Sequence, residues 1–355
     1  MDAFYASVEV HHNPALRDKP VVVGADPKGG RGRGVVEAAS YAARRYGIRA
    51  AMPISRAWTL SEAARRRGEE PVVFAHGNRR LYVEMSHRVM AILTPAGDAF
   101  EEASIDEAYL DLSSLGSFEA AVERARELKR EIFDREGLTC SVGLGPNKLV
   151  AKIASDFRKP DGLTVVRSGE VQAFLDPLRV RVVPGVGPKT EAFLHGKGLR
   201  TVADLRGVEA GRLTEWFGKW GGDLWRKARG ISTDPVSNEW ERKSVGEQET
   251  FEADTLDPAF VLERARVMAG EVYRRFVAEG LHAFRTVTVT VRFSGFQTRS
   301  RSHTGPAPFR SEGDLQGAVR RLLEPFFDAR ENPKGKKLRL IGVRVEKLLR
   351  DPEPG

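Results

Sequence analysis

Two adjacent carboxylates, Asp106 and Glu107, are the residues of this chain whose type and spacing point most directly to chemistry. They stand at the start of an alternating run, residues 108–111, that favours a β-strand. Because neighbouring residues of a regular strand point to opposite faces, the pair can share a metal ion only at an irregular strand start or a turn. A divalent cation held by carboxylates and substrate phosphates would offset the paired charges. The alternative is a solvated hairpin turn, since a short motif is only a hypothesis.

The elements that must position this pair alternate between strands and helices. They are a strand at 71–75, a helix at 81–92, a hairpin at 99–112, a helix at 117–136, a strand at 138–144 and a helix at 147–156. The order β-α-β-β-α-β resembles a ferredoxin-like split motif, although its first strand is nearly absent from the start of the sequence.

Length, charge and cysteine content limit the class of protein. A chain of 355 residues is too long for one core and predicts two to four domains. The net charge of +8 favours a polyanionic partner, with nucleic acid the leading candidate, although basic proteins that never bind DNA also exist. The one cysteine, Cys140, excludes an intrachain disulfide and a cysteine metal cluster. No membrane span or signal peptide is predicted, so we expect a cytoplasmic protein.

Three further stretches surround the acidic pair. We predict a small basic α/β region at 8–67, a mostly helical region at 161–230 and, after a polar linker at 231–241, a last domain at 242–350. In that last domain, the predicted strands are 242–251, 284–297 and 337–348, and the predicted helices are 258–277 and 312–327.

Two features in these stretches are typical of DNA backbone binding. Gly185 and Gly187, with Lys189 beside them, follow helix-hairpin-helix spacing, and such a turn holds a phosphate through backbone N–H groups. The alternative is an ordinary glycine-rich turn. Residues 280–311 contain no acidic residue, and a positive strand surface there suits a phosphate backbone. Its arginines are Arg285, Arg292, Arg299, Arg301 and Arg310. The alternative is a solvated edge strand guarded by cations.

Eight motifs in order along the whole chain carry a resemblance to a known family. They are residues 1–9 (MDAFYASVE), 33–36 (RGVV), 40–44 (SYAAR), 104–111 (SIDEAYLD), 147–156 (NKLVAKIASD), 159–162 (KPDG), 184–187 (PGVG) and 242–246 (RKSVG). With these motifs the chain resembles the Y-family DNA polymerases, most closely the DinB, or DNA polymerase IV, group.

The resemblance implies an α+β multidomain fold shaped as a right hand. It would have a ferredoxin-like palm at 1–7 and 68–160, small fingers at 8–67, a helix-hairpin-helix thumb at 161–230 and an α/β little finger at 242–350. The implied activity is low-fidelity, template-directed DNA synthesis past damaged bases, a role in DNA repair. The implied partners are primer-template DNA and a dNTP, and we expect a monomer.

The resemblance also implies the roles of individual residues around two Mg²⁺ ions. Asp106 would bind metal, Glu107 would complete the primer-side site, and the backbone carbonyl of Met1 would face a metal. The triphosphate contacts would be Tyr41, Arg44 and Lys159. Tyr5 would close over the sugar and clash with a 2′-OH, with simple core packing as the alternative.

This sequence departs from the family's pattern at several positions. The family has a further metal-binding aspartate before the position of Asp2, at the end of the first strand. We expect a misassigned start, with a truncated chain or an inactive product as alternatives. Glu37 puts an acid near the presumed triphosphate loop without an explanation. The C-terminus shows no clear sliding-clamp peptide.

Two other functions remain open at this level. A catalytically impaired DNA-binding protein would explain an absent metal ligand. A helix-hairpin-helix glycosylase or nuclease would explain the turn at 184–187 but not the acidic motif together with Lys159.

Overall fold

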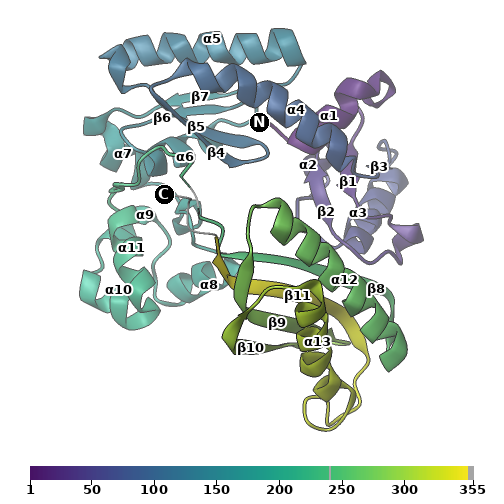
Figure 1. The fold of residues 1–355 in the computed structure, drawn as a ribbon. Coiled ribbons are helices and arrows are strands. Elements are labelled where there is room, and N and C mark those ends of the chain that lie inside the picture. The colour runs from purple at the N-terminus through teal and green to yellow at the C-terminus, as the bar shows by residue number, and fades with distance from the viewer. Residues whose placement is uncertain (240, 351–355) are drawn as a thin grey trace. The chain divides into compact units, whose positions relative to one another are not determined.

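The structure is a computed structural model that describes residues 1–239 and 241–350 (Figure 1). It divides into two compact units, Met1–Glu239 and Trp240–Gly355, and the division falls inside the predicted linker. Residues 351–355, where we predicted no clear clamp peptide, lie outside the described residues.

The first unit opens with a small α/β region and continues into the hairpin that carries the acidic pair. Its elements up to this hairpin are α1 (Phe4–His12), β1 (Val21–Gly24), β2 (Val36–Ala39), α2 (Tyr41–Arg45), α3 (Ile54–Arg66), β3 (Val73–Ala75), α4 (Arg79–Leu93), β4 (Ala99–Ser104) and β5 (Glu107–Asp111). The elements that follow are α5 (Phe118–Glu136), β6 (Val142–Leu144), α6 (Lys148–Phe157), β7 (Leu163–Val165), α7 (Val171–Leu175), α8 (Pro188–Gly196), α9 (Val202–Arg206), α10 (Ala210–Phe217) and α11 (Lys219–Lys227).

The strands of this unit form three small sheets, with orders β2-β1-β3, β4-β5 and β6-β7. The hairpin predicted at 99–112 is confirmed as β4 and β5. Two strand pairings cross the predicted domain boundaries, which stay predictions. β3 pairs with β1 (Val21↔Val73) and so belongs to the same sheet as strands of the 8–67 region. β7, predicted within the helical 161–230 region, pairs with β6 (Val142↔Leu163). Strand periodicity gives the buried face of a strand, not its partner, so sequence reading could not assign either pairing.

The first two residues of the chain connect the β4-β5 hairpin to the segment that leads into β6. The terminal ammonium of Met1 donates to the backbone carbonyl of Asp106 at 2.6 Å. The next backbone N–H, that of Asp2, donates to the carbonyl of Thr139 at 3.0 Å. The N-terminus therefore joins the acidic turn to the segment that leads into β6.

The second unit is one antiparallel sheet with helices on one face. It consists of β8 (Ser244–Thr255), α12 (Pro258–Ala278), β9 (Ala283–Phe293), β10 (Thr298–Phe309), α13 (Glu312–Leu323) and β11 (Leu338–Leu349), in the sheet order β10-β9-β11-β8. Val287, Val289 and Val291 are fully buried against the helices. β10 was not predicted as a separate strand, because its polar and cationic residues carry no hydrophobic alternation.

The opposite face of this sheet is lined with hydroxyl groups. Threonine hydroxyls of β9 form hydrogen bonds of 2.9 Å with hydroxyls of β10, in the pairs Thr286–Thr304, Thr288–Ser302 and Thr290–Ser300.

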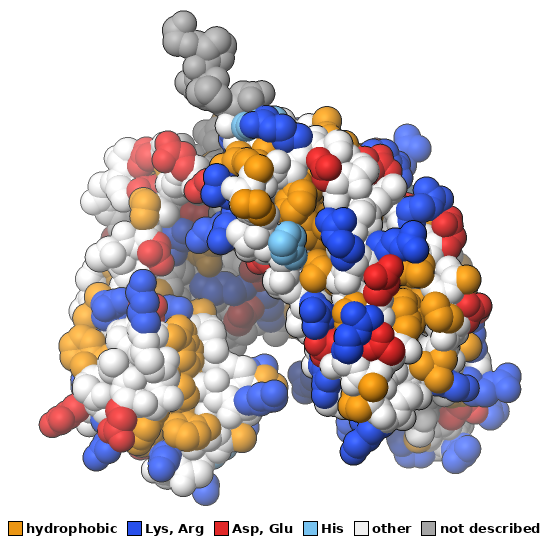
Figure 2. Space-filling model, turned by 60° about the horizontal axis from the view of Figure 1, so that its bottom comes forward, with side chains coloured by type: hydrophobic (Ala, Val, Ile, Leu, Met, Phe, Trp, Pro, Cys, Tyr) orange, Lys and Arg blue, Asp and Glu red, His pale blue; other side chains and the backbone are white. Residues whose placement is uncertain are grey.

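In the view of Figure 2, Lys and Arg side chains are spread over the surface with Asp and Glu among them. Among the described residues, no helix has the length and apolar character that crossing a membrane requires.

Candidate active site

The acidic pair lies where the hairpin register is irregular. Asp106 is in the turn, and Glu107 is the first residue of β5 and pairs with Ser104 across a register shift. The Ser104 hydroxyl donates to Asp106 Oδ1 at 2.9 Å. Both carboxylate residues line one cavity, so the irregularity that sequence reading required for a shared site is present.

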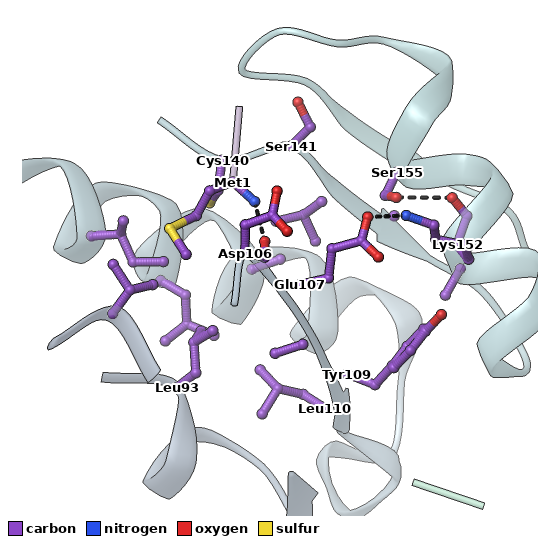
Figure 3. A pocket seen from close by; sticks show the side chains of 18 of the residues that line it. Met1, Leu93, Asp106, Glu107, Tyr109, Leu110, Cys140, Ser141, Lys152 and Ser155 are labelled. Carbon is purple, nitrogen blue, oxygen red and sulfur yellow. Dashed lines mark hydrogen bonds and ion pairs between the residues drawn. The ribbon is translucent and has the colours of Figure 1, made fainter. Parts of the chain in front are cut away.

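This cavity has a volume of about 180 Å³ and lies between the hairpin, β6, α4, α5 and α6 (Figure 3). Its apolar wall includes Leu93, Leu110 and Val142, and its polar end carries the acidic pair and two lysines, Lys152 and Lys159. Met1 also lines it. The predicted metal-facing role of the Met1 carbonyl stays a prediction, because the hydrogen bond that joins Met1 to the hairpin comes from its terminal ammonium group.

A chain of alternating charges runs from the acidic pair along α6. Glu107 Oε1 and Lys152 Nζ form an ion pair. Lys152 Nζ lies 3.8 Å from Asp156, and Asp156 Oδ1 lies 2.6 Å from Lys159 Nζ. The negative charge of Glu107 is therefore neutralised by the ammonium group of Lys152, which Asp156 links to Lys159.

Tyr41 is the first residue of α2 and Arg44 lies in its last turn; Ser40 caps this helix through its side chain. The guanidinium carbon of Arg44 is 4.4 Å from the ring centre of Tyr41, and Arg44 Nε donates to the carbonyl of Ala39 at 3.0 Å. The hydroxyl of Tyr41 is buried and has no hydrogen-bond partner. Burial raises the pKa of this hydroxyl, the charge of Asp2 adds to the rise, and Arg44 and Lys159 oppose it. The predicted triphosphate contacts therefore lie within electrostatic reach of one another.

Tyr5 stacks on Tyr82 with ring centres 4.3 Å apart. Burial raises the pKa of the Tyr5 hydroxyl; Arg79 opposes this rise, whereas Asp106 and Glu37 add to it. A Cβ atom built at Gly77 would lie 3.0 Å from the carboxylate of Glu37 and 3.6 Å from the ring of Tyr82. The side chain of Glu37, whose role the sequence does not explain, therefore lies near the stacked tyrosines.

In the helical region, Gly185 has φ +99°, a conformation that L side chains rarely adopt, and a side chain there would press on Trp220 at 3.0 Å. Gly187 is the N-cap residue of α8, and Lys189 is exposed on its first turn. The turn therefore places a helix N-terminus beside an exposed cation, which is the arrangement that favours an anion.

Comparison with known proteins decides the family. The impB/mucB/samB family matches residues 1–156, its C-terminal domain matches residues 242–355, and the DNA polymerase-iota thumb domain matches residues 181–232. DNA polymerase IV of Methanoculleus marisnigri is 44% identical over 98% of this chain and 92% of its own length. DNA polymerase IV of Streptococcus pyogenes serotype M6 is 37% identical over the same shares. The chain belongs to the Y-family of DNA polymerases.

Solved structures agree with this assignment. The Y-family chimera Dbh-Dpo4(243-245)-Dbh superposes with a TM-score of 0.86 at 30% identity, covering 99% of this chain and 98% of that one. DinB from Sulfolobus solfataricus superposes with a TM-score of 0.62 at 30% identity and the same coverage. The right-hand fold expected from sequence is confirmed, and this Y-family polymerase is a metal-dependent nucleotidyltransferase. None of these comparisons supports the alternative of a catalytically impaired DNA-binding protein.

Of the five arginines in residues 280–311 of this Y-family polymerase, the four on β9 and β10 fall into two groups. Arg299 Nη1 donates to the carbonyl of Glu331 at 2.8 Å, and Arg301 Nη1 lies 2.5 Å from Glu331 Oε1. Arg292 instead donates to Thr298 Oγ1 at 3.0 Å, and Arg285 is exposed. The premise that no acid offsets these arginines is therefore corrected for Arg299 and Arg301, because Glu331 comes from outside the stretch 280–311.

Sequence reasoning missed two residues of the site. Lys152 lies one helical turn before Asp156 in the motif 147–156, so the i, i+4 spacing could have placed it beside the acidic chain. Tyr82, the stacking partner of Tyr5, lies in an ordinary amphipathic helix and carried no signal of its own.

Proposed function

We propose that this Y-family polymerase extends a DNA primer past damaged template bases, with Asp106 and Glu107 as its metal-binding carboxylates. The observation that carries the proposal is the cavity in which both carboxylates and two lysines meet, within a chain 44% identical to a DNA polymerase IV. Phosphoryl transfer depends on positioning and on neutralised triphosphate charge, and this arrangement supplies groups for both.

The donor set at the cavity fits Mg²⁺. Mg²⁺ is usually bound through one or two carboxylates together with substrate phosphates and water, not by a full protein cage. Among residues 1–239 and 241–350, no group of three or more His, Cys, Asp or Glu could hold a metal. Asp106 and Glu107 supply a pair of carboxylates at the cavity, and we propose that they hold two Mg²⁺ ions together with the substrate phosphates. When bound, such ions activate the primer 3′-OH and neutralise the triphosphate.

The remaining roles follow from what each side chain presents. Lys159 and Arg44 would bind the triphosphate oxygens as a point charge and a planar fork. The buried, unpartnered hydroxyl of Tyr41 would donate to the same group, which satisfies a polar atom that otherwise costs free energy. Tyr5, braced by Tyr82, would exclude a 2′-OH by steric contact.

Primer-template DNA would be held through its phosphates. One Dbh structure is an insertion ternary complex, and its 29% identity over 99% of this chain supports DNA and nucleotide as the substrates here. Gly185, Gly187 and Lys189 would contact one backbone segment, and the arginines of β9 and β10 another. Such contacts position the duplex without reading its sequence.

The test is running-start primer extension on a template with one abasic site, beside the undamaged template. We expect Mg²⁺-dependent extension through and beyond the abasic position, and EDTA should abolish it. Extension of the undamaged template that always stops before the abasic site would contradict the lesion-bypass part of the proposal. Failure on both templates would contradict polymerase activity itself.

A further inference from the structure

The loop that carries Lys159 into β7 is held in a strained conformation. Asp161, two residues after Lys159, has φ +53°, in the left-handed region that non-glycine residues seldom adopt. Aspartate tolerates this region better than most residues. Such a conformation persists only where the surroundings hold it in place. The contacts around Asp161 are therefore informative.

The first anchor of this loop is the carboxylate of Asp2, which is only 2% exposed. Asp2 Oδ2 accepts a hydrogen bond from the backbone N–H of Asp161 at 2.8 Å. Asp2 Oδ1 accepts a hydrogen bond from the hydroxyl of Ser141 at 2.7 Å. The Ser141 hydroxyl oxygen in turn accepts a hydrogen bond from the backbone N–H of Gly162 at 3.2 Å. Asp2 is thus committed to the loop and not to the cavity beside Asp106.

The second anchor is Lys129 on α5, whose side chain is 15% exposed. Its ammonium group donates to the carbonyl of Cys140 at 2.5 Å, to the carbonyl of Asp161 at 3.0 Å and to Asp161 Oδ1 at 2.5 Å. An ammonium group has three N–H donors, and all three are used here. Lys129 therefore joins helix α5, the entrance to β6 and the Lys159 loop at one point.

The other end of the loop faces the active site. Lys159 lines the cavity together with Asp106 and Glu107, and its ammonium is 2.6 Å from Asp156. Only Pro160 separates Lys159 from the anchored Asp161, so a shift of Asp161 displaces the ammonium group as well. The placement of the Lys159 charge thus depends on contacts made outside the cavity.

We infer that Lys129, together with Asp2, is a positioning residue that fixes Lys159 for binding the triphosphate of the incoming nucleotide. The inference rests on the proposed triphosphate role of Lys159. Lys129 itself is turned toward the loop backbone and touches no predicted substrate contact. A residue that served stability alone would leave nucleotide affinity unchanged once the protein is folded.

The experiment measures equilibrium binding of the complementary dNTP to the protein on a dideoxy-terminated primer-template, with Mg²⁺ present. Lys129→Met keeps the long apolar stem and removes the three donors. We expect nucleotide Kd to rise about 10-fold, since misplacing a positioned group by ~1 Å can cost up to roughly 10²-fold. Primer-template Kd should stay within about twofold. Arg126→Met, one turn earlier on α5 at a surface ion pair, is the matched control and should change neither.

A double-mutant cycle with Lys159→Ala separates positioning from general damage. Lys159→Ala should weaken nucleotide binding, and adding Lys129→Met to it should change the Kd by less than about twofold, because the positioned group is already gone. Independent, multiplying losses would overturn the positioning role. Asp161→Gly, which keeps the positive φ but removes the carboxylate, serves as the second variant if Lys129→Met does not fold. It should also raise nucleotide Kd, by a few-fold, and an unchanged Kd would overturn the inference.

The triphosphate role of Lys159 and its positioning by Lys129 can be contradicted separately. Unchanged nucleotide Kd in Lys159→Ala would contradict the proposed triphosphate role and the inference with it. A weakened Lys159→Ala beside an unaffected Lys129→Met would leave the triphosphate role intact and overturn only the positioning by Lys129.

Discussion

The cations beside the acidic turn and the arginines of the second unit's sheet are both paired with acids, but at different distances along the chain. Lys152 and Lys159 contact Asp156, which lies within four residues of each. Arg299 and Arg301 share Glu331, which lies thirty or more residues away. Short sequence motifs can predict the local lysine–aspartate pairs, but they cannot predict the long-range pairs with Glu331.

The two groups also differ in what the acid does. In the first unit, the carboxylates are the groups on which the proposed chemistry depends. In the second unit, one carboxylate shared by two guanidinium groups lowers the charge available to a phosphate backbone. Removing an acid should therefore abolish function in the first region and strengthen DNA binding in the second.

The largest expected effect is on the acidic turn. Asp106→Asn and Glu107→Gln should each slow Mg²⁺-dependent nucleotide incorporation about 10²-fold or more, because each removes stabilisation of developing charge. Primer-template affinity should stay within a few-fold. The matched control is Glu102→Gln, an exposed carboxylate on the same hairpin. Near-normal single-turnover rates in either active-site variant would place the chemistry elsewhere.

A second effect concerns sugar selection. Tyr5→Ala should lower discrimination against ribonucleotides roughly 10- to 200-fold, the range for a single steric contact. Tyr82→Phe removes the hydroxyl that bonds Glu9 but keeps the stacked ring, so it should leave discrimination unchanged. The measurement is the ratio of kcat/KM for the two sugars. An unaltered ratio in Tyr5→Ala would assign Tyr5 to core packing.

The arginine groups should differ in their salt dependence. Alanine at both Arg285 and Arg292 should make the log–log slope of DNA affinity against salt shallower by about 1.8, at about 0.9 per phosphate contact. Alanine at both Arg299 and Arg301 should change it by no more than about 0.9, because Glu331 offsets one of the two charges. Equal changes for both pairs would break the distinction between the two groups.

The smallest effect is expected at Lys152. Its ammonium pairs with Glu107 and competes with a metal cation for the same carboxylate. Lys152→Met should therefore lower the Mg²⁺ concentration for half-maximal extension by a few-fold, as expected for one partly exposed charge pair. A rise in that concentration would show that Lys152 assists metal binding.

Much of this architecture could be predicted from sequence because its signals are local. Residue patterns only a few positions long predict the hairpin at 99–112, the capped helix after Ser117 and the turn at 184–187. The pairing of β3 with β1 and of β7 with β6 joins segments whose sequences carry no mutual signal. The same limit applies to Asp2, whose carboxylate is committed to the backbone of Asp161 across 159 residues. Long-range polar contacts of this kind depend on the folded geometry and not on any one motif.

Template-directed synthesis at the acidic turn is tested most directly by single-nucleotide incorporation on four templates that differ only in the templating base. Each of the four dNTPs is offered separately to the unaltered protein and to Asp106→Asn with Mg²⁺ present. We expect the unaltered protein to prefer the complementary nucleotide on every template, and Asp106→Asn to lose about 10²-fold or more of the rate on all four. Incorporation that ignores the templating base, or equal rates for the two proteins, would contradict this expectation.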